Sequence, residues 1–157
     1  MAEQLGGNPP SGTVAPGLHK EVISGVGATR QLRTDESGSL CLLDAATGVV
    51  YTLPDNPAVG TTFSFLVSVA VTSNAHSVIT GNAAIFMVGG CIMADVTVAT
   101  SGDFFEADGT SIVGLSAGGS TTGGLLGEYY EVTAVSSTVW AINGVLHGAG
   151  TLATPFI

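Results

Sequence analysis

Short runs of β-branched and aromatic residues, separated by turn residues, fill the chain from Thr29 to Ile157. Between Thr62 and Val71, every second residue from Phe63 onward is apolar, as a strand buried on one face requires. No window combines the apolar spacing of a helix with helix-capping residues. The sequence therefore predicts an all-β fold.

The predicted strands are short, spaced by roughly 8 to 12 residues and joined by glycine-rich turns, a pattern typical of an antiparallel β-sandwich or barrel. We expect a jelly-roll-like arrangement of this kind. No helical crossovers are predicted, which excludes a parallel α/β fold. The predicted strands are 29–34, 39–44, 49–53, 62–71, 77–80, 84–88, 92–99, 104–106, 111–115, 126–135, 138–142 and 145–147.

The first 28 residues differ from the rest, because glycine and proline recur throughout them. Glycine and proline interrupt helices and strands, so we predict an irregular N-terminal arm over residues 1–28, with no regular element. The remainder, residues 29–157, has the length of one domain. We therefore expect an arm followed by a single β domain.

Positive charge is confined to the start of the chain. Lys20, Arg30 and Arg33 are its only Lys and Arg residues, against 12 Asp and Glu residues and a net charge of −9. The acidic remainder has no row of cations to oppose phosphate, so we expect no nucleic-acid partner. The contrast in charge indicates that the arm lies against an acidic surface, its own or a partner's.

The longest apolar stretches, residues 63–71 and 83–94, are shorter than the ~18 residues that a membrane-spanning helix needs. The first ten residues also lack the cationic start and apolar core of a secretory signal. We therefore expect no membrane partner and synthesis in a cytoplasm.

The sequence contains no arrangement typical of an active site. His19, His76 and His147 lie far apart, and we expect each to be solvated or hydrogen-bonded rather than catalytic. The acidic cluster at residues 103–109 lacks the spacing of a calcium loop, which favours a solvated hairpin over a metal-binding or catalytic role. We expect no enzymatic activity, no cofactor and no metal.

Three local features allow two interpretations each. Cys41 and Cys91 are predicted to be buried thiols, with a disulfide as the alternative. The glycine-dense residues 114–127 are interpreted as a flexible loop or as a close backbone contact between subunits. Trp140 lies in an alternating strand, which favours a core or interface position over a sugar-stacking one.

Three stretches together form a recognisable pattern. Arg30 to Asp44 contains a short strand, then Ser-Gly, then a strand that ends in Asp. Val-Tyr-Thr-Leu-Pro at residues 50–54 precedes Ala-Val-Gly-Thr-Thr-Phe-Ser-Phe at residues 58–65, and Glu131-Val132 precedes Trp-Ala-Ile-Asn-Gly at residues 140–144 and Ala-Thr-Pro-Phe at residues 153–156. Over residues 29–157 the chain resembles the small β-rich capsid decoration (cement) proteins of tailed bacteriophages, in particular cyanophages.

This resemblance implies a β-sandwich or barrel that forms a homotrimer and binds the outside of an icosahedral phage head. The partner would be the major capsid protein, and the protein would be made in the host cytoplasm and located on the capsid exterior. Such a protein stabilises contacts between capsomers and needs no catalytic residue.

Two groups of residues are candidates for these contacts. The first lies in or next to the arm and would contact the capsid or a neighbouring subunit: Leu18, Lys20, Arg30 and Arg33. The second consists of candidate interface aromatics: Tyr129, Tyr130 and Trp140.

Two other functions compete with capsid decoration. A tail-fibre or spike module would bind a receptor or glycan, with Tyr51, Tyr129, Tyr130 and Trp140 as sugar platforms. A carbohydrate-active enzyme would use Glu106 with Asp103 or Asp108. Aromatic residues make up only 6% of the chain, too few for a rich sugar-binding face, so capsid decoration is the leading hypothesis.

Overall fold

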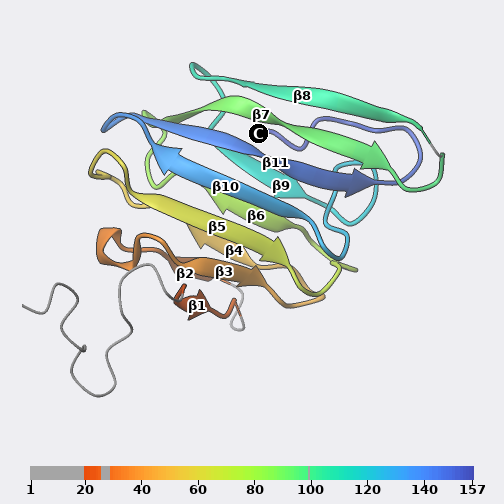
Figure 1. The fold of residues 1–157 in the computed structure, drawn as a ribbon, viewed down its shortest axis with the longest axis horizontal. Coiled ribbons are helices and arrows are strands. Elements are labelled where there is room, and N and C mark those ends of the chain that lie inside the picture. Colours follow the sequence, from red (N-terminus) through yellow and green to blue (C-terminus); the bar gives the residue numbers. More distant parts are fainter. Residues whose placement is uncertain (1–19, 26–28, 99) are drawn as a thin grey trace, which may run out of the picture.

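The computed structural model describes residues 20–25, 29–98 and 100–157, which form eleven strands and one 3-10 turn, Thr34–Glu36 (Figure 1). Residues 1–19 of the predicted arm lie outside the described residues. The strands are β1 (Val22–Ile23), β2 (Thr29–Gln31), β3 (Leu40–Leu43), β4 (Val50–Thr52), β5 (Thr62–Val67), β6 (His76–Ile79), β7 (Phe86–Asp95), β8 (Gly102–Asp108), β9 (Gly114–Ala117), β10 (Tyr129–Ala134) and β11 (Val139–Gly148).

Within the described ranges the strands form two sheets, which confirms the predicted all-β, sandwich-like class. The seven-stranded sheet has the order β1-β3-β5-β10-β11-β7-β8, and the four-stranded sheet has the order β2-β4-β6-β9. Figure 1 shows the four-stranded sheet behind the larger one. The core therefore lies between the two sheets, and the other face of the larger sheet, here called the open face, points away from the core.

The first six strands alternate between the sheets, so that the chain winds around the core. As a result, β1–β3, β3–β5, β2–β4 and β4–β6 are parallel pairs, as is β7–β11. A parallel pair needs a long crossover, which is usually a helix. In the first four of these pairs, a strand of the opposite sheet is the crossover. The predicted antiparallel pairing, as in a jelly roll, is therefore wrong, because both sheets are mixed.

Two pairs of predicted strands are each one continuous strand. β7 joins 86–88 and 92–95 of the predicted strands 84–88 and 92–99, and β11 joins 139–142 and 145–147 of the predicted strands 138–142 and 145–147. A Cβ on Gly89 would lie 2.3 Å from the Ile142 carbonyl oxygen, and one on Gly144 would lie 2.3 Å from the Tyr130 Cβ. These glycines therefore mark close approach between strands rather than turns.

The predicted arm contains a strand. Val22 and Ile23 pair with Leu40 and Cys41, and Ile23 is buried in the core. The prediction that residues 1–28 hold no regular element is therefore wrong at β1. Hydrogen bonding to β3 stabilises a strand there, although a glycine-rich segment has a weak intrinsic preference for strand structure.

Aromatic side chains from the inner face of the larger sheet dominate the core. The ring of Phe65 stacks on that of Tyr130, with centroids 5.3 Å apart, and Phe63 lies 6.2 Å from Trp140. All four side chains are fully buried. Burial of each contributes about 1.5 to 3 kcal/mol, so this cluster is a main source of stability.

Cys41 and Cys91 are free and buried, as predicted. Both point into the core, but β5, β10 and β11 lie between their strands. Four strand spacings separate them by roughly 19 Å, far beyond the reach of a disulfide. Burial raises the pKa of each thiol to about 12.

Gly48 and Gly38 provide a matched test of close approach. Both have a left-handed backbone, with φ of 89° and 92°, but a Cβ on Gly48 would lie 2.5 Å from the Ala75 carbonyl oxygen, whereas one on Gly38 would have no neighbour within 4 Å. Gly38→Ala should lower the free energy of unfolding by ~1 kcal/mol from backbone strain, and Gly48→Ala by ~2 to 4 kcal/mol. Urea denaturation measures both, and equal losses would contradict the close contact at Gly48.

Candidate functional site

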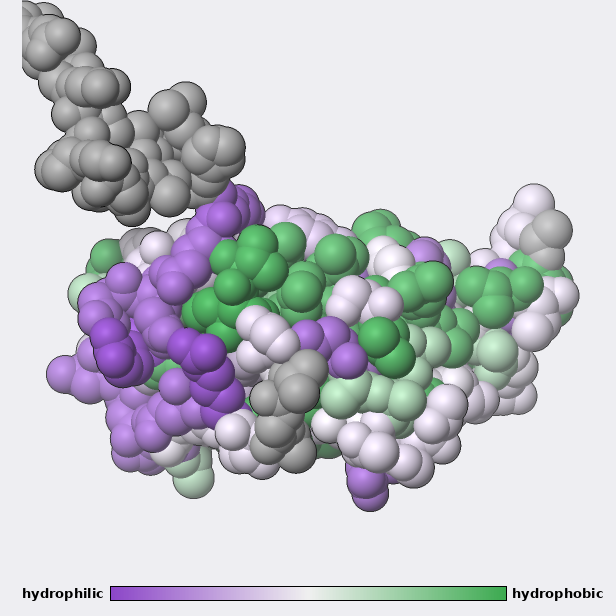
Figure 2. Space-filling model, turned by 90° about the horizontal axis from the view of Figure 1, so that it is seen from below, coloured by the Kyte–Doolittle hydropathy of each residue, from purple (hydrophilic) through white to green (hydrophobic). Residues whose placement is uncertain are grey.

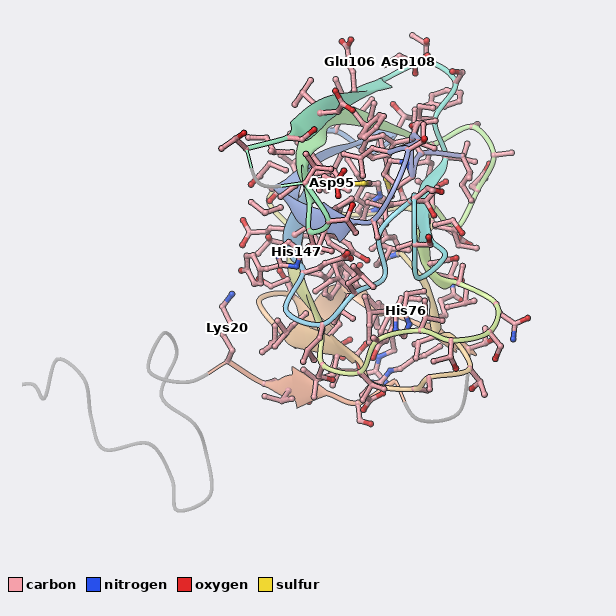
Figure 3. The ribbon with its side chains drawn as sticks, turned by 90° about the vertical axis from the view of Figure 1, so that its right-hand side faces the viewer. Lys20, His76, Asp95, Glu106, Asp108 and His147 are labelled. Carbon is pink, nitrogen blue, oxygen red and sulfur yellow. The ribbon has the colours of Figure 1, made fainter. Side chains whose placement is uncertain are left out.

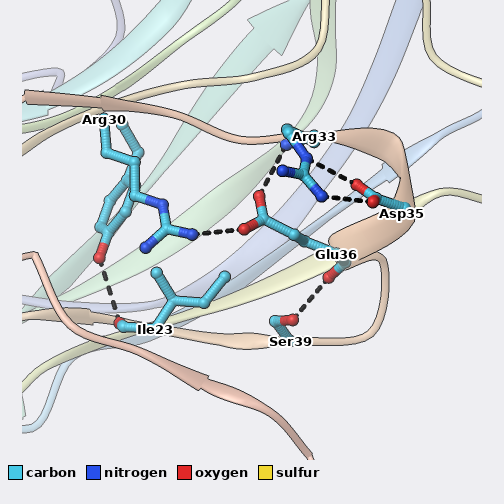
Figure 4. Close-up of polar contacts among 7 residues, drawn as sticks. Ile23, Arg30, Arg33, Asp35, Glu36 and Ser39 are labelled. Carbon is cyan, nitrogen blue, oxygen red and sulfur yellow. Dashed lines mark hydrogen bonds and ion pairs between the residues drawn. The ribbon is translucent and has the colours of Figure 1, made fainter.

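The two arginines are paired with carboxylates of the nearby 3-10 turn, Thr34–Glu36. Arg30 forms an ion pair with Glu36. The Arg33 guanidinium donates two hydrogen bonds to the Asp35 carboxylate, one from each of two nitrogens (Figure 4). Hydrogen bonding to Asp35 raises the pKa of Arg33, and the same contact lowers the pKa of Asp35. These cations already have acidic partners, which weakens the expectation that Arg30 and Arg33 meet an acidic partner protein.

Lys20 is placed differently. Its Nζ donates a hydrogen bond of 2.7 Å to the Ser64 hydroxyl, which in turn donates to the Glu131 carboxylate at 3.3 Å. Ser64 and Glu131 are register partners on β5 and β10, so the ammonium group lies over the larger sheet. Leu18, the fourth residue of the predicted contact group, lies outside the described residues.

The three candidate interface aromatics do not lie on one surface. Tyr130 and Trp140 point into the core and are fully buried, so neither is available to a partner or a sugar, and Tyr51 is buried as well. Tyr129 alone of the three is exposed. Alternation along β10 places adjacent residues on opposite faces, which is why Tyr129 and Tyr130 cannot share a surface.

Tyr129 belongs to a line of apolar side chains across the open face. Neighbouring strands place these residues in direct register, one from each of six strands, and we call them the apolar row: Leu42, Leu66, Tyr129, Val145, Ile92 and Phe104. The last four are between 42% and 64% exposed, and the two leucines are half-buried. The row contains no charged residue, and it crosses the sheet from β3 to β8.

Phe104 is held in place by a glycine. A Cβ on Gly90 would lie 2.5 Å from the Phe104 Cζ atom and 2.4 Å from the Phe105 carbonyl oxygen. The Phe104 ring therefore lies against the backbone of β7, in space that a side chain at position 90 would occupy. This packing orients the ring while leaving the side chain 64% exposed.

Apolar surface also reaches the β1 edge of the molecule. Val22 is exposed there, beside the half-buried Leu40. Seen from this edge, hydrophobic residues cover the middle of the molecule and hydrophilic residues gather at one end (Figure 2). Large exposed apolar patches mark interaction sites, so the open face is the candidate functional site.

A second line of residues follows the apolar row one register step along the strands. We call it the polar row: Ser64, Glu131, Asn143, Gly90 and Glu106. Lys20 contacts it at Ser64, near one edge of the sheet, whereas Glu106 lies at the opposite edge on β8 (Figure 3). The apolar row is thus uncharged, whereas the line beside it carries Lys20 near one edge, Glu131 on the central strand β10 and Glu106 at the opposite edge.

The acidic cluster at residues 103–109 forms most of the edge strand β8 and the turn after it. Asp103 and Glu106 point to opposite faces of this strand, since their register partners are the buried Met93 and the outward Gly90. The Asp108 carboxylate accepts hydrogen bonds from the Ser111 hydroxyl and from the backbone N–H groups of Thr110 and Ser111, which lower its pKa. These contacts are those of a capped turn, in agreement with the hairpin interpretation.

Glu128 is a buried carboxylate that the sequence analysis did not identify. It accepts hydrogen bonds from the backbone N–H groups of Gly124, Leu125 and His147, at 2.8 to 3.0 Å. Burial raises its pKa, although these hydrogen bonds oppose the shift. These hydrogen bonds attach the glycine-rich loop to β11. In the sequence, the sign of this role is a glutamate that directly follows a glycine-rich stretch.

His76 is the second buried polar side chain in a structural role. Its Nδ1 accepts a hydrogen bond from the Val49 N–H at 3.2 Å, and its Nε2 lies 2.9 Å from the Val69 carbonyl oxygen. A neutral ring with the proton on Nε2 satisfies both partners. Burial lowers the pKa of His76, and the ring is hydrogen-bonded as expected.

Comparisons with protein-family models, with curated proteins and with solved structures found no match to this chain. Within the part of the chain that the structure describes, no helix is long and apolar enough to cross a membrane. The same residues contain no group of three or more His, Cys, Asp or Glu side chains arranged to hold a metal ion.

The raised pKa of Glu128 predicts a pH dependence of stability. The native state holds the proton more tightly than the unfolded state, so ionisation costs native-state stability as pH rises from about 4 to about 7. Wild-type protein should lose free energy of unfolding over this range relative to Glu128→Gln, which carries no titrating group there. Urea denaturation at both pH values measures the difference, and parallel pH dependence in the two proteins would contradict the assignment.

Proposed function

We propose that this chain is a capsid decoration protein, which binds the outer surface of an icosahedral phage head as a trimer and stabilises contacts between capsomers. Its partners are the major capsid protein and further copies of the chain. Its action is adhesion between protein surfaces and involves no chemical step.

The observation that carries this proposal is the apolar row on the open face. Six apolar side chains in register across a sheet form a continuous adhesive surface, and Phe104 is oriented by its contact with Gly90. A protein that acts by surface contact requires such a surface, because burial of apolar area supplies most of the free energy of association.

The sequence resemblance supports the same function. The stretches that carry it correspond to β2 and β3, to β4 and β5, and to β10 and β11. They therefore include four adjacent strands of the larger sheet (β3, β5, β10 and β11) and two of the smaller sheet (β2 and β4), rather than a single peripheral loop. The likeness concerns the body of the domain, which is the part that would sit on a head.

Attachment by several weak contacts explains how such a protein binds tightly. Once one subunit of a trimer is bound, the second and third contacts are effectively intramolecular, and affinity rises without new chemistry. We propose that residues 1–19 add a further contact with the head, since a glycine- and proline-rich segment can bind a sheet edge through its main chain. Arg30 and Arg33 are not assigned to this contact, because Glu36 and Asp35 already pair with them.

Binding to heads is the direct test. Purified protein mixed with expanded heads of the phage that encodes it, assembled without it, should appear at regular positions on the head surface in electron cryomicroscopy. Decorated heads should also withstand heat or low salt better than bare heads. Heads that stay bare after mixing would contradict the proposal. Binding of the protein to the tail of the whole phage would favour the fibre or spike function instead.

A truncation tests the contribution of the N-terminal segment. A chain that begins at Lys20 keeps β1, including the buried Ile23 whose carbonyl accepts a hydrogen bond from Tyr51. We expect it to fold and to oligomerise like the full chain, but to occupy heads less completely at equal concentration, as measured by co-sedimentation. Equal occupancy would show that residues 1–19 do not contribute to attachment.

A further inference from the structure

We propose that neighbouring copies of this chain cover the open face, with the apolar row at the centre of the contact and Lys20 of one copy facing Glu106 of the next. The number of copies, three, rests on the proposed function. The contact itself rests on the register, the exposure and the charges of the open face.

The size of the open face fits a contact between protein chains. From β3 to β8 the apolar row crosses five strand spacings of ~4.8 Å, or about 24 Å. Along the strands, the ten residues of β7 and of β11 extend about 33 Å. The product, roughly 800 Å², is the total that each copy would bury, about 400 Å² against each of its two neighbours in a ring; in sum it matches the area that one partner buries in a standard protein–protein interface.

The direction of the apolar row fits a ring of copies. The row runs across the strands, so copies arranged around an axis parallel to their strands would hold their rows at the same height. One half of each row, on β3, β5 and β10, would then meet the half on β11, β7 and β8 of the next copy. A single head-to-tail contact, repeated around the ring, would bury every residue of the row.

The charges flanking the row are complementary in the same arrangement. Lys20 lies over Ser64 in the first half of the polar row, and Glu106 ends its second half. Among the described residues, neither side chain takes part in an ion pair. Head-to-tail packing at equal height brings the ammonium group of one copy towards the Glu106 carboxylate of the next, whereas Glu131, on the central strand β10, is linked to Lys20 of its own chain through Ser64.

Charge reversal provides the sharpest test. In analytical ultracentrifugation of the full chain, Lys20→Glu should raise the dissociation constant of the oligomer roughly tenfold, because Glu106 of the next copy would then oppose a like charge. The double variant Lys20→Glu/Glu106→Lys should return to within about threefold of wild type. An intrachain role of Lys20 at Ser64 would not be rescued by a change at position 106, so failure of the double variant overturns the pair.

Substitution within the apolar row tests the centre of the contact. Ile92→Glu and Val145→Glu should each raise the dissociation constant by roughly 100-fold or more, with unchanged circular dichroism as evidence of folding. Val59→Glu is the matched control, because Val59 is 72% exposed in the turn before β5 and lies outside the row. It should leave the oligomer intact. Row variants that oligomerise like wild type would overturn the proposal.

Head binding separates this proposal from the proposed function. A row-dependent trimer that does not bind heads would support the contact and contradict the decoration role. A wild-type monomer that binds heads, and loses binding in the row variants, would assign the row to the capsid and overturn the contact between copies. A row-dependent dimer would support self-contact and contradict the trimer.

Discussion

The fold depends on the burial of two sheet faces against each other. Strands β1 to β6 alternate between the sheets, so successive strands contribute side chains to opposite sides of one core. Aromatic rings from β5, β10 and β11 fill its centre. Because each strand in the first half serves as the crossover for its neighbours, parallel pairing needs no helix, and the backbone hydrogen bonds of each strand are completed by segments that are distant in sequence.

The open face is the necessary counterpart of that core. Side chains alternate along a strand, so the residues that do not enter the core point outward at the same positions in register. In most β proteins such outward residues are polar. Here one register line is apolar from β3 to β8, and the neighbouring line consists of polar residues and one glycine from β5 to β8. The same alternation therefore builds the core and displays the surface through which we propose that the protein acts.

Buried polar side chains hold in place the loops that connect the strands. Glu128 accepts hydrogen bonds from three backbone N–H groups, two in the glycine-rich loop and one in β11. His76 forms hydrogen bonds to the turn before β4 and to the chain after β5. Both groups have pKa values shifted by burial, Glu128 upward and His76 downward. Neither requires a functional explanation, since their hydrogen bonds account for their positions.

Alternation and turn residues are local signals, so the all-β class, the positions of most strands and the burial of both cysteines can be predicted from the sequence alone. Four features follow from the arrangement of the strands in space: the parallel pairing, the burial of Tyr130 and Trp140, the internal pairing of Arg30 and Arg33, and the apolar row. Leu42 and Phe104 are far apart in the chain, and no local pattern shows that their strands lie in one register. A surface assembled from six strands exists only once the order of those strands in the sheet is set, and that order follows from packing around a shared core rather than from any single segment.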